Sequence, residues 1–166
     1  MNPNDALVQR LKTQAVTWER GNRYEDFHVD QQFTHHWGRT LSAADNMLFS
    51  VLTLHYGPSH VNAPIAQAHG HRSTPVNPLL VFNTVFGLSV EDLSDMGGPV
   101  LGVEALVYGA TVYPDDTLRA SSTVVGMRLA SNRPGFGIVT WHTRGVNQRD
   151  EEVIRFQRSN LVRSKG

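Results

Sequence analysis

Residues 77–94, NPLLVFNTVFGLSVEDLS, decide the fold of this chain. Asn77 is a good helix N-cap and Pro78 suits the first helical position, so the stretch is predicted to form one helix. Its apolar side chains cover nearly the whole circumference, and a helix that is apolar all round is a buried one. A domain of this size can bury such a helix by wrapping a sheet around it.

The second half of the chain is predicted to supply that sheet. Short polar breaks containing Pro, Asp, Asn, Arg and Gln separate four β-branched or alternating runs, which are residues 103–113, 117–129, 136–146 and 152–163. Such short connections predict antiparallel neighbours, that is, a meander. An apolar helix held by a curved antiparallel sheet is the hot-dog arrangement, so the expected fold class is α+β with a hot-dog fold.

The first half is predicted to add two helices and a weak strand. Residues 5–19 form a lead-in helix, and residues 27–37 an edge strand. A capping box at 42–45 starts the next helix, which Gly57-Pro58 must end. Its apolar stripe is Met47, Leu48, Val51 and Leu52, and the same progression predicts that His55 and Tyr56 face inward. We expect one domain over residues 1–166, with 1–26 as an N-terminal helical lead-in.

Composition limits the possible functions. The chain has 166 residues, and its 15 basic and 15 acidic side chains cancel, so nothing attracts the whole surface to nucleic acid or an anionic membrane. With no cysteine there is no disulfide, zinc-thiolate site or thiol nucleophile. No signal peptide, membrane span or cofactor motif is recognisable. We expect a cytoplasmic protein with a small-molecule or protein partner and no cofactor.

Four of the eight histidines, at 55, 60, 69 and 71, fall within seventeen residues between the two predicted core helices. Histidine titrates near neutral pH, so His55 and His60 could form a general acid/base pair. The alternative is a satisfied core imidazole at 55 and a turn residue at 60. His69 and His71 lack a cysteine or nearby carboxylate to complete a metal site, so no metal is predicted. Their loop is expected to be a polar flap in which Arg72 meets a phosphate or carboxylate.

The start of the 77–94 helix is a second candidate site. Free N–H groups at a helix N-terminus can hold a thioester oxygen or carboxylate, and the Asn77 side chain could assist. Pro78 has no N–H, so the amide of Leu79 or Leu80 would have to serve. The alternative is that Asn77-Pro78 is simply a good helix start.

Residues 38–62, GRTLSAADNMLFSVLTLHYGPSHVN, resemble the opening of the MaoC-like enoyl-thioester hydratases: GRT, an apolar helix, then D-x-N-P-x-H-x-D. The similarity is greatest to the branch containing mesaconyl-CoA and itaconyl-CoA hydratases. Further matches run in order to residue 163. The resemblance implies a hot-dog homodimer that acts as a lyase on an acyl group carried by coenzyme A or a carrier protein.

Carried over by position, the family's catalytic histidine falls on His60, but its aspartate falls on His55 and its asparagine on Gly57. The glycine whose N–H polarises the thioester carbonyl falls on Pro78. Losing one oxyanion donor costs about 3 to 4 kcal/mol of transition-state stabilisation, so ordinary enoyl-CoA hydration is expected to be poor.

Three readings stay open. One is a repurposed enzyme in which His55 and His60 carry out an elimination, isomerisation or cyclisation, with Tyr56, Asn62 or Asn77 orienting the substrate. Another is a non-catalytic hot-dog binding or partner subunit. The third is an acyl-thioester hydrolase, for which the central helix offers acids only near its far end, at Glu91 and Asp92.

Overall fold

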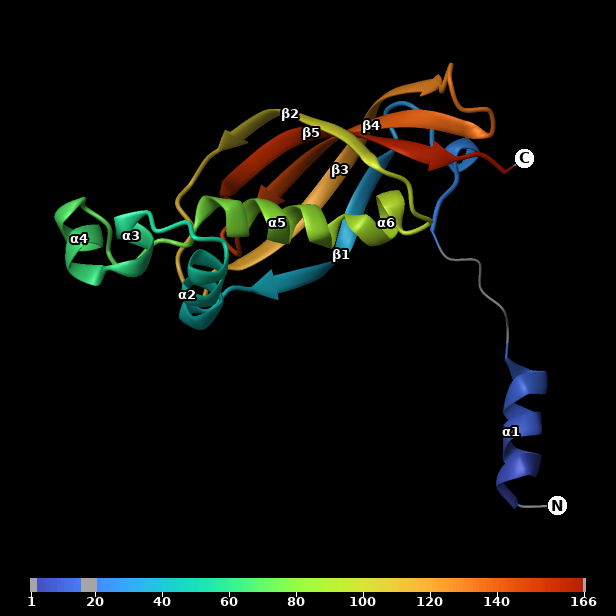
Figure 1. The fold of residues 1–166 in the computed structure, drawn as a ribbon, viewed down its shortest axis with the longest axis horizontal. Helices are drawn as coiled ribbons and strands as arrows, with labels where there is room; N and C mark the ends of the chain where they lie inside the picture. The colour runs from blue at the N-terminus through green and yellow to red at the C-terminus, as the bar shows by residue number, and fades with distance from the viewer. Residues whose placement is uncertain (1–2, 16–20, 166) are drawn as a thin grey trace.

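A computed structural model describes residues 3–15 and 21–165 of the chain. One antiparallel sheet curves around the helix α5 (Pro78–Leu88), as Figure 1 shows. The strand order is β1-β3-β4-β5-β2. The strands are β1 (Gln32–Thr40), β2 (Val100–Tyr108), β3 (Thr117–Leu129), β4 (Phe136–Val146) and β5 (Glu152–Arg163). The predicted α+β class and the sheet wrapped around a helix are therefore confirmed.

The predicted meander is wrong at one connection. β3, β4 and β5 are sequential antiparallel neighbours, but β2 pairs with β5 at the far edge of the sheet instead of with β3. β2 also begins and ends earlier than predicted, at Val100 and Tyr108. The reason is that residues 109–116 cross the end of the sheet. The Gly109 amide donates to Val153 O at 2.9 Å, and the Asp115 amide donates to Leu41 O at 2.7 Å, beside β1.

The predicted helix 77–94 is broken at Ser89 into α5 and the short α6 (Val90–Ser94). The Ser89 hydroxyl donates to Phe86 O at 2.7 Å and so competes with the helical hydrogen bonds. α5 lies very close to β4, because a Cβ at Gly145 would come within 2.6 Å of Val85 Cγ2. Only a glycine at that point of β4 lets the helix approach so closely.

The sheet covers only one side of α5. Leu80, Val81, Thr84 and Val85 are buried and face the strands, where Leu118, Ile154 and Phe156 belong to the same hydrophobic cluster. Positions 79, 83 and 87 follow each other at helical spacing on the opposite side, and all three are exposed. The prediction that the helix is buried all round is thus wrong for that face, because a single five-stranded sheet cannot enclose a helix.

The elements before the core differ slightly from expectation. β1 begins five residues later than predicted, because the chain turns at residues 29–30, where Asp30 has a φ of +68°. The lead-in helix α1 runs from Pro3 to Gln14, and its Leu7, Val8 and Leu11 are exposed. Val16 and Trp18, also assigned to that helix, lie outside the described residues. Among the described residues, no helix is long and apolar enough to cross a membrane.

A buried polar chain ties β1 to α6 and to the middle of the sheet. His35 is 4% exposed, its Nδ1 donates to Asp92 Oδ2 at 2.6 Å, and its Nε2 lies 2.9 Å from Ser122 Oγ. Ser122 Oγ is in turn 2.9 Å from Thr143 Oγ1. Burial lowers the pKa of His35, although the Asp92 carboxylate opposes the effect. The folded protein therefore holds this histidine in its neutral form.

This network predicts a loss of stability in mild acid. The folded-state pKa of His35 lies below its ordinary value, so the unfolded chain takes up the proton first as the pH falls below about 6.5. The free energy of unfolding should then decrease, and His35→Asn should remove part of that decrease. Urea titrations between about pH 5.5 and 8 measure it, with the exposed His28→Asn as the matched control. An unchanged pH slope in His35→Asn would contradict the assignment.

Candidate active site

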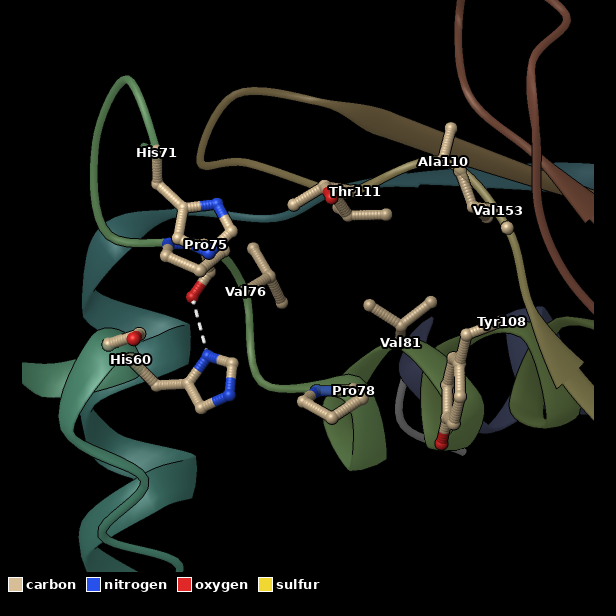
Figure 2. A pocket seen from close by; sticks show the side chains of 13 residues that line it. His60, His71, Pro75, Val76, Pro78, Val81, Tyr108, Ala110, Thr111 and Val153 are labelled. Carbon is tan, nitrogen blue, oxygen red and sulfur yellow. Dashed lines mark hydrogen bonds between the residues drawn. The ribbon is translucent and has the colours of Figure 1, made fainter. Parts of the chain in front are cut away.

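A pocket of about 300 Å³ opens beside the N-terminus of α5 (Figure 2). The end of β2 and the segment after it form one wall, and the loop before α5 forms another. Valines line much of the interior, at positions 76, 81, 112 and 153. The polar side chains that reach it are Ser59, His60, His71, Tyr108 and Thr111. A small apolar cavity with a few polar groups is a typical site for an organic ligand.

The segment that carries the histidines overhangs one end of the sheet. The predicted capping box of α2 (Ala43–Leu52) is confirmed: Ser42 Oγ accepts from the Asp45 amide at 3.1 Å, and Asp45 Oδ2 accepts from the Ser42 amide at 2.9 Å. α2 ends before the predicted Gly57-Pro58 stop, because Leu54 adopts a φ of +55° that reverses the chain. α3 (Pro58–Val61) and α4 (Ala63–Ala68) follow.

The predicted apolar stripe of α2 faces outward. Met47, Leu48, Val51 and Leu52 are 45% to 73% exposed, whereas Asn46 and Ser50 are buried. Tyr56 is 56% exposed, so the prediction that it faces inward is wrong, while His55 is half-buried. The reason is that α2 packs its polar side against the chain that leads into α5, with which Asn46 and Ser50 form hydrogen bonds.

The ring of His55 is held by Asn77. Asn77 Oδ1 accepts the Leu79 amide at 3.0 Å, which orients the carboxamide so that Nδ2 faces His55 Nδ1 at 2.6 Å. Because Nδ2 can only donate, His55 Nδ1 must accept, and the neutral ring carries its proton on Nε2. Asn77 is fully buried, so this orientation is fixed by its surroundings.

The ring of His60 is held in the opposite tautomer. His60 Nδ1 lies 3.0 Å from the carbonyl oxygen of Pro75, the contact dashed in Figure 2. A carbonyl only accepts, so Nδ1 donates and the lone pair of the neutral ring is on Nε2. The two ring centroids are 5.9 Å apart, with 28° between their planes. The pair therefore offers one free N–H donor, on His55, and one free nitrogen acceptor, on His60.

A residue that the sequence analysis did not select, Asn46, fixes the backbone around both rings. Its Nδ2 donates to His60 O at 3.0 Å and to Pro75 O at 3.2 Å, and its Oδ1 accepts the Asn77 amide at 2.8 Å. A buried asparagine on an otherwise apolar helix was the available signal. Gly57 also matters, because a Cβ there would lie 2.9 Å from His60 Cδ2. A larger residue at 57 would displace the His60 ring from this position.

Of the two predicted catalytic histidines only His60 lines the pocket, since His55 and Asn77 lie behind its wall residues, and the other predicted substrate contacts lie outside it as well. The Leu79 amide is donated to Asn77 Oδ1, and the Leu80 amide to Asn77 O at 2.9 Å, so neither is free for a thioester oxygen. Asn62 is exposed and caps α4, where its Oδ1 accepts the Ile65 amide at 3.2 Å. Arg72 is exposed and stacks on the Tyr113 ring at 4.4 Å, on the wall of a neighbouring polar pocket.

The remaining two histidines of the cluster separate. His69 Nδ1 lies 2.9 Å from Ser59 Oγ at the surface, while His71 lines the pocket and its Nδ1 is 3.2 Å from the Tyr113 hydroxyl. In the described parts of the chain, no three His, Cys, Asp or Glu residues gather as metal ligands. The places of Tyr108 and Thr111 in the pocket depend on where β2 ends, which the sequence misplaced.

Comparison with known proteins assigns the family. A model of the mesaconyl-CoA hydratase family matches residues 3–166. The chain belongs to this family of MaoC-like hydratases. It is 39% identical to a beta-methylmalyl-CoA dehydratase from Chloroflexus aurantiacus over 149 residues, which cover 87% of this chain and 41% of that protein.

Solved structures agree with the family assignment. A structure described as a MaoC domain dehydratase from Chloroflexus aurantiacus is 36% identical and superposes with a TM-score of 0.82, covering 92% of this chain and 43% of that one. A double hot-dog protein from Mycobacterium tuberculosis, 22% identical, has a TM-score of 0.79 and covers 87% and 45%. The predicted hot-dog fold is thus confirmed. The family member described here spans less than half the length of these relatives.

The tautomers of the two rings can be tested directly. At about pH 8, where an ordinary histidine is neutral, long-range ¹H–¹⁵N spectra should show the Nδ1–H form for His60 and the Nε2–H form for His55. Asn77→Ala removes the donor to His55 and should leave the His60 signal in place. Signals from an Nε2–H tautomer at His60 would contradict the hydrogen bond to Pro75.

Proposed function

We propose that this chain is a lyase of the hydratase/dehydratase type that acts on an acyl thioester, with His60 as the general base. The observation that carries the proposal is the free Nε2 of His60, which faces a mainly apolar pocket while Nδ1 is tied to Pro75 O. An imidazole held in this way accepts a proton at one defined atom. The family membership supplies the substrate class.

In the elimination direction, His60 Nε2 removes the proton from Cα of a 3-hydroxyacyl thioester. The C–H electrons form the Cα=Cβ bond, and the C–O electrons leave with the hydroxyl oxygen. The His60 imidazolium returns its proton to that oxygen, which departs as water. Hydration is the reverse. Isomerisation or cyclisation would begin with the same removal of a proton from Cα.

The hydrogen bond from Asn77 supports a different role for His55 than proton transfer. Its Nδ1 accepts from Asn77, so giving up the Nε2 proton would create an imidazole anion, which is far too basic to form here. His55 is therefore proposed to donate a hydrogen bond to the departing or attacking oxygen rather than to transfer a proton. The family aspartate would accept at this point, so the replacement reverses the direction of the hydrogen bond.

Polarisation of the thioester carbonyl is expected to be weak. Pro78 has no N–H, and the Leu79 and Leu80 amides are already donated to Asn77. The absence of one oxyanion donor costs about 3 to 4 kcal/mol, which corresponds to a rate some hundreds of times slower. Slow hydration of simple enoyl thioesters follows, and this is why a specialised substrate or reaction remains part of the proposal.

A hydrolase and a non-catalytic partner subunit are the two alternative functions. A hydrolase would need a carboxylate at the pocket, but Glu91 accepts from Trp37 Nε1, Asp92 accepts from His35, and neither lines it. A non-catalytic partner subunit is the other alternative, and it is supported by Pro78 and by the Leu79 and Leu80 amides, which are donated to Asn77 instead of being available to a thioester. Measured turnover separates that role from catalysis.

The catalytic proposal predicts unequal effects of the two histidines. His60→Ala should lower kcat/KM for an enoyl thioester by about 10²- to 10⁴-fold, because it removes the base. His55→Ala should cost less, about 10-fold, because it removes one neutral hydrogen bond. The decay of enoyl ultraviolet absorbance measures turnover, and the exposed His69→Ala is the control. Undiminished activity in His60→Ala would reject the proposal, and so would a wild-type protein that turns over no acyl thioester.

We also propose that two copies of this chain associate as a homodimer. β2 is an edge strand whose side chains are exposed at eight of its nine positions, and edge strands with free backbone groups pair readily. The apolar stripe of α2 and the outer face of α5 are exposed as well. A double hot-dog protein is among the structural neighbours, which supports the pairing of two such folds.

Charge placed on this surface should disrupt the dimer. Light scattering after gel filtration should give twice the mass of the chain for the wild-type protein. Leu101→Lys, on a side chain of β2 that is 51% exposed, should weaken association by about 30-fold or more. Val29→Lys, equally exposed but away from β2, is the matched control. A wild-type monomer at micromolar concentration would contradict the proposal.

A further inference from the structure

The pocket next to His60 contains no full charge. Of the described residues that line it, none is Arg, Lys, Asp or Glu. His60 and Tyr108 lie at opposite ends of the pocket, as Figure 2 shows, and Val81, Ala110 and Val153 lie toward the tyrosine end. An acyl chain that presents its Cα to His60 would extend toward this end. Its far end would therefore meet apolar side chains.

Two arginines, Arg72 and Arg149, line a neighbouring polar pocket and interact with other side chains there. Arg72 stacks on Tyr113 on the wall of the neighbouring polar pocket. Arg149 is paired with Asp116 at 3.2 Å and with Glu151 at 2.8 Å. Neither arginine lines the pocket that holds His60. A carboxylate at the Tyr108 end would therefore have no cation beside it within this chain.

The environment at that end also disfavours negative charge. The Tyr108 side chain is 41% exposed, and the partial loss of water around it raises the pKa of its phenol. A ligand carboxylate in the same place would lose water in the same way. Burying an ionised group without a partner costs free energy, so a ligand that carries such a carboxylate binds more weakly.

We propose that this site accepts a short acyl thioester whose acyl group is uncharged and apolar at its far end, and that it discriminates against a dicarboxylic acyl group such as mesaconyl. This inference rests on the proposed function for the identity of the pocket, and it distinguishes the chain from the substrate in its family's name. A volume of about 300 Å³, at the lower end for ligand pockets, matches a short acyl group.

Binding of two saturated thioesters tests the inference without turnover. Butyryl-CoA and succinyl-CoA share the coenzyme A portion and the chain length, differ by the terminal carboxylate, and cannot be hydrated. Titration calorimetry on the full chain should show butyryl-CoA binding at least about 30-fold more tightly. Equal or tighter binding of succinyl-CoA would overturn the inference. Failure to bind either thioester would overturn it as well.

Substitutions at the far end locate the preference. Tyr108→Arg provides the missing cation and should shift the preference toward succinyl-CoA by about 10-fold or more. Because Tyr108 lies on β2, Leu101→Lys, which places a charge on the same strand away from the pocket, is the matched control and should keep the wild-type preference. Tyr108→Phe keeps the ring and removes the hydroxyl, so it should preserve the wild-type preference. Ala110→Arg places a cation at the same end from a different position and repeats the test if Tyr108→Arg misfolds. An unchanged preference in both folded arginine variants would overturn the placement.

The outcomes separate this inference from the proposed function. If butyryl-CoA is preferred but no acyl thioester is turned over, the catalytic proposal fails and the inference about the pocket stands. If enoyl thioesters are turned over but mesaconyl-CoA is processed as well as crotonyl-CoA, the inference fails and the catalytic proposal stands.

Discussion

The carboxamide of Asn77 is the constraint on which the site depends. Its oxygen accepts the Leu79 amide and starts α5, while its Nδ2 lies 2.6 Å from His55 Nδ1 and 3.1 Å from Ser50 Oγ. One buried side chain thus joins the central helix, the overhanging α2 and a ring of the histidine pair. Because a buried amide must satisfy both ends, its orientation is determined, and the tautomer of His55 is determined with it.

The same arrangement explains why the Leu79 and Leu80 amides are not available as N–H donors to a ligand. An amide donated to a capping side chain cannot also bind a substrate oxygen, so the cap that stabilises α5 uses the first-turn donors that a thioester would need. Pro78 strengthens the helix start and removes another donor. The chemistry proposed for the site accordingly relies on two ring nitrogens, and its rate is expected to be modest. The uncharged interior then favours substrates that bring no charge of their own.

Several apolar surfaces of the chain are exposed to solvent. A sheet of five strands covers one side of α5 and leaves the other side, β2 and the stripe of α2 open. His55 is half-buried next to the exposed Tyr56, and its ring is 5.9 Å from that of His60. The proposed association through this surface would reduce the solvent around His55 and strengthen the hydrogen bond that His55 is proposed to donate.

Elements whose signals are local could be predicted from the amino-acid sequence. The Asn77-Pro78 start, the Ser42–Asp45 capping box and the bounds of β3, β4 and β5 follow from turn and cap chemistry and from strand alternation, and all appear as predicted. The resemblance of residues 38–62 gave the family and selected His55 and His60. The strand order, the direction that the α2 stripe faces and the ring tautomers could not be predicted in this way. Whether β2 lies beside β3 or β5, and whether the α2 stripe faces the core or solvent, depends on contacts between distant segments. The ring tautomers depend on Asn77 and Pro75, which lie fifteen or more residues from the rings they hold, so no local pattern could reveal them.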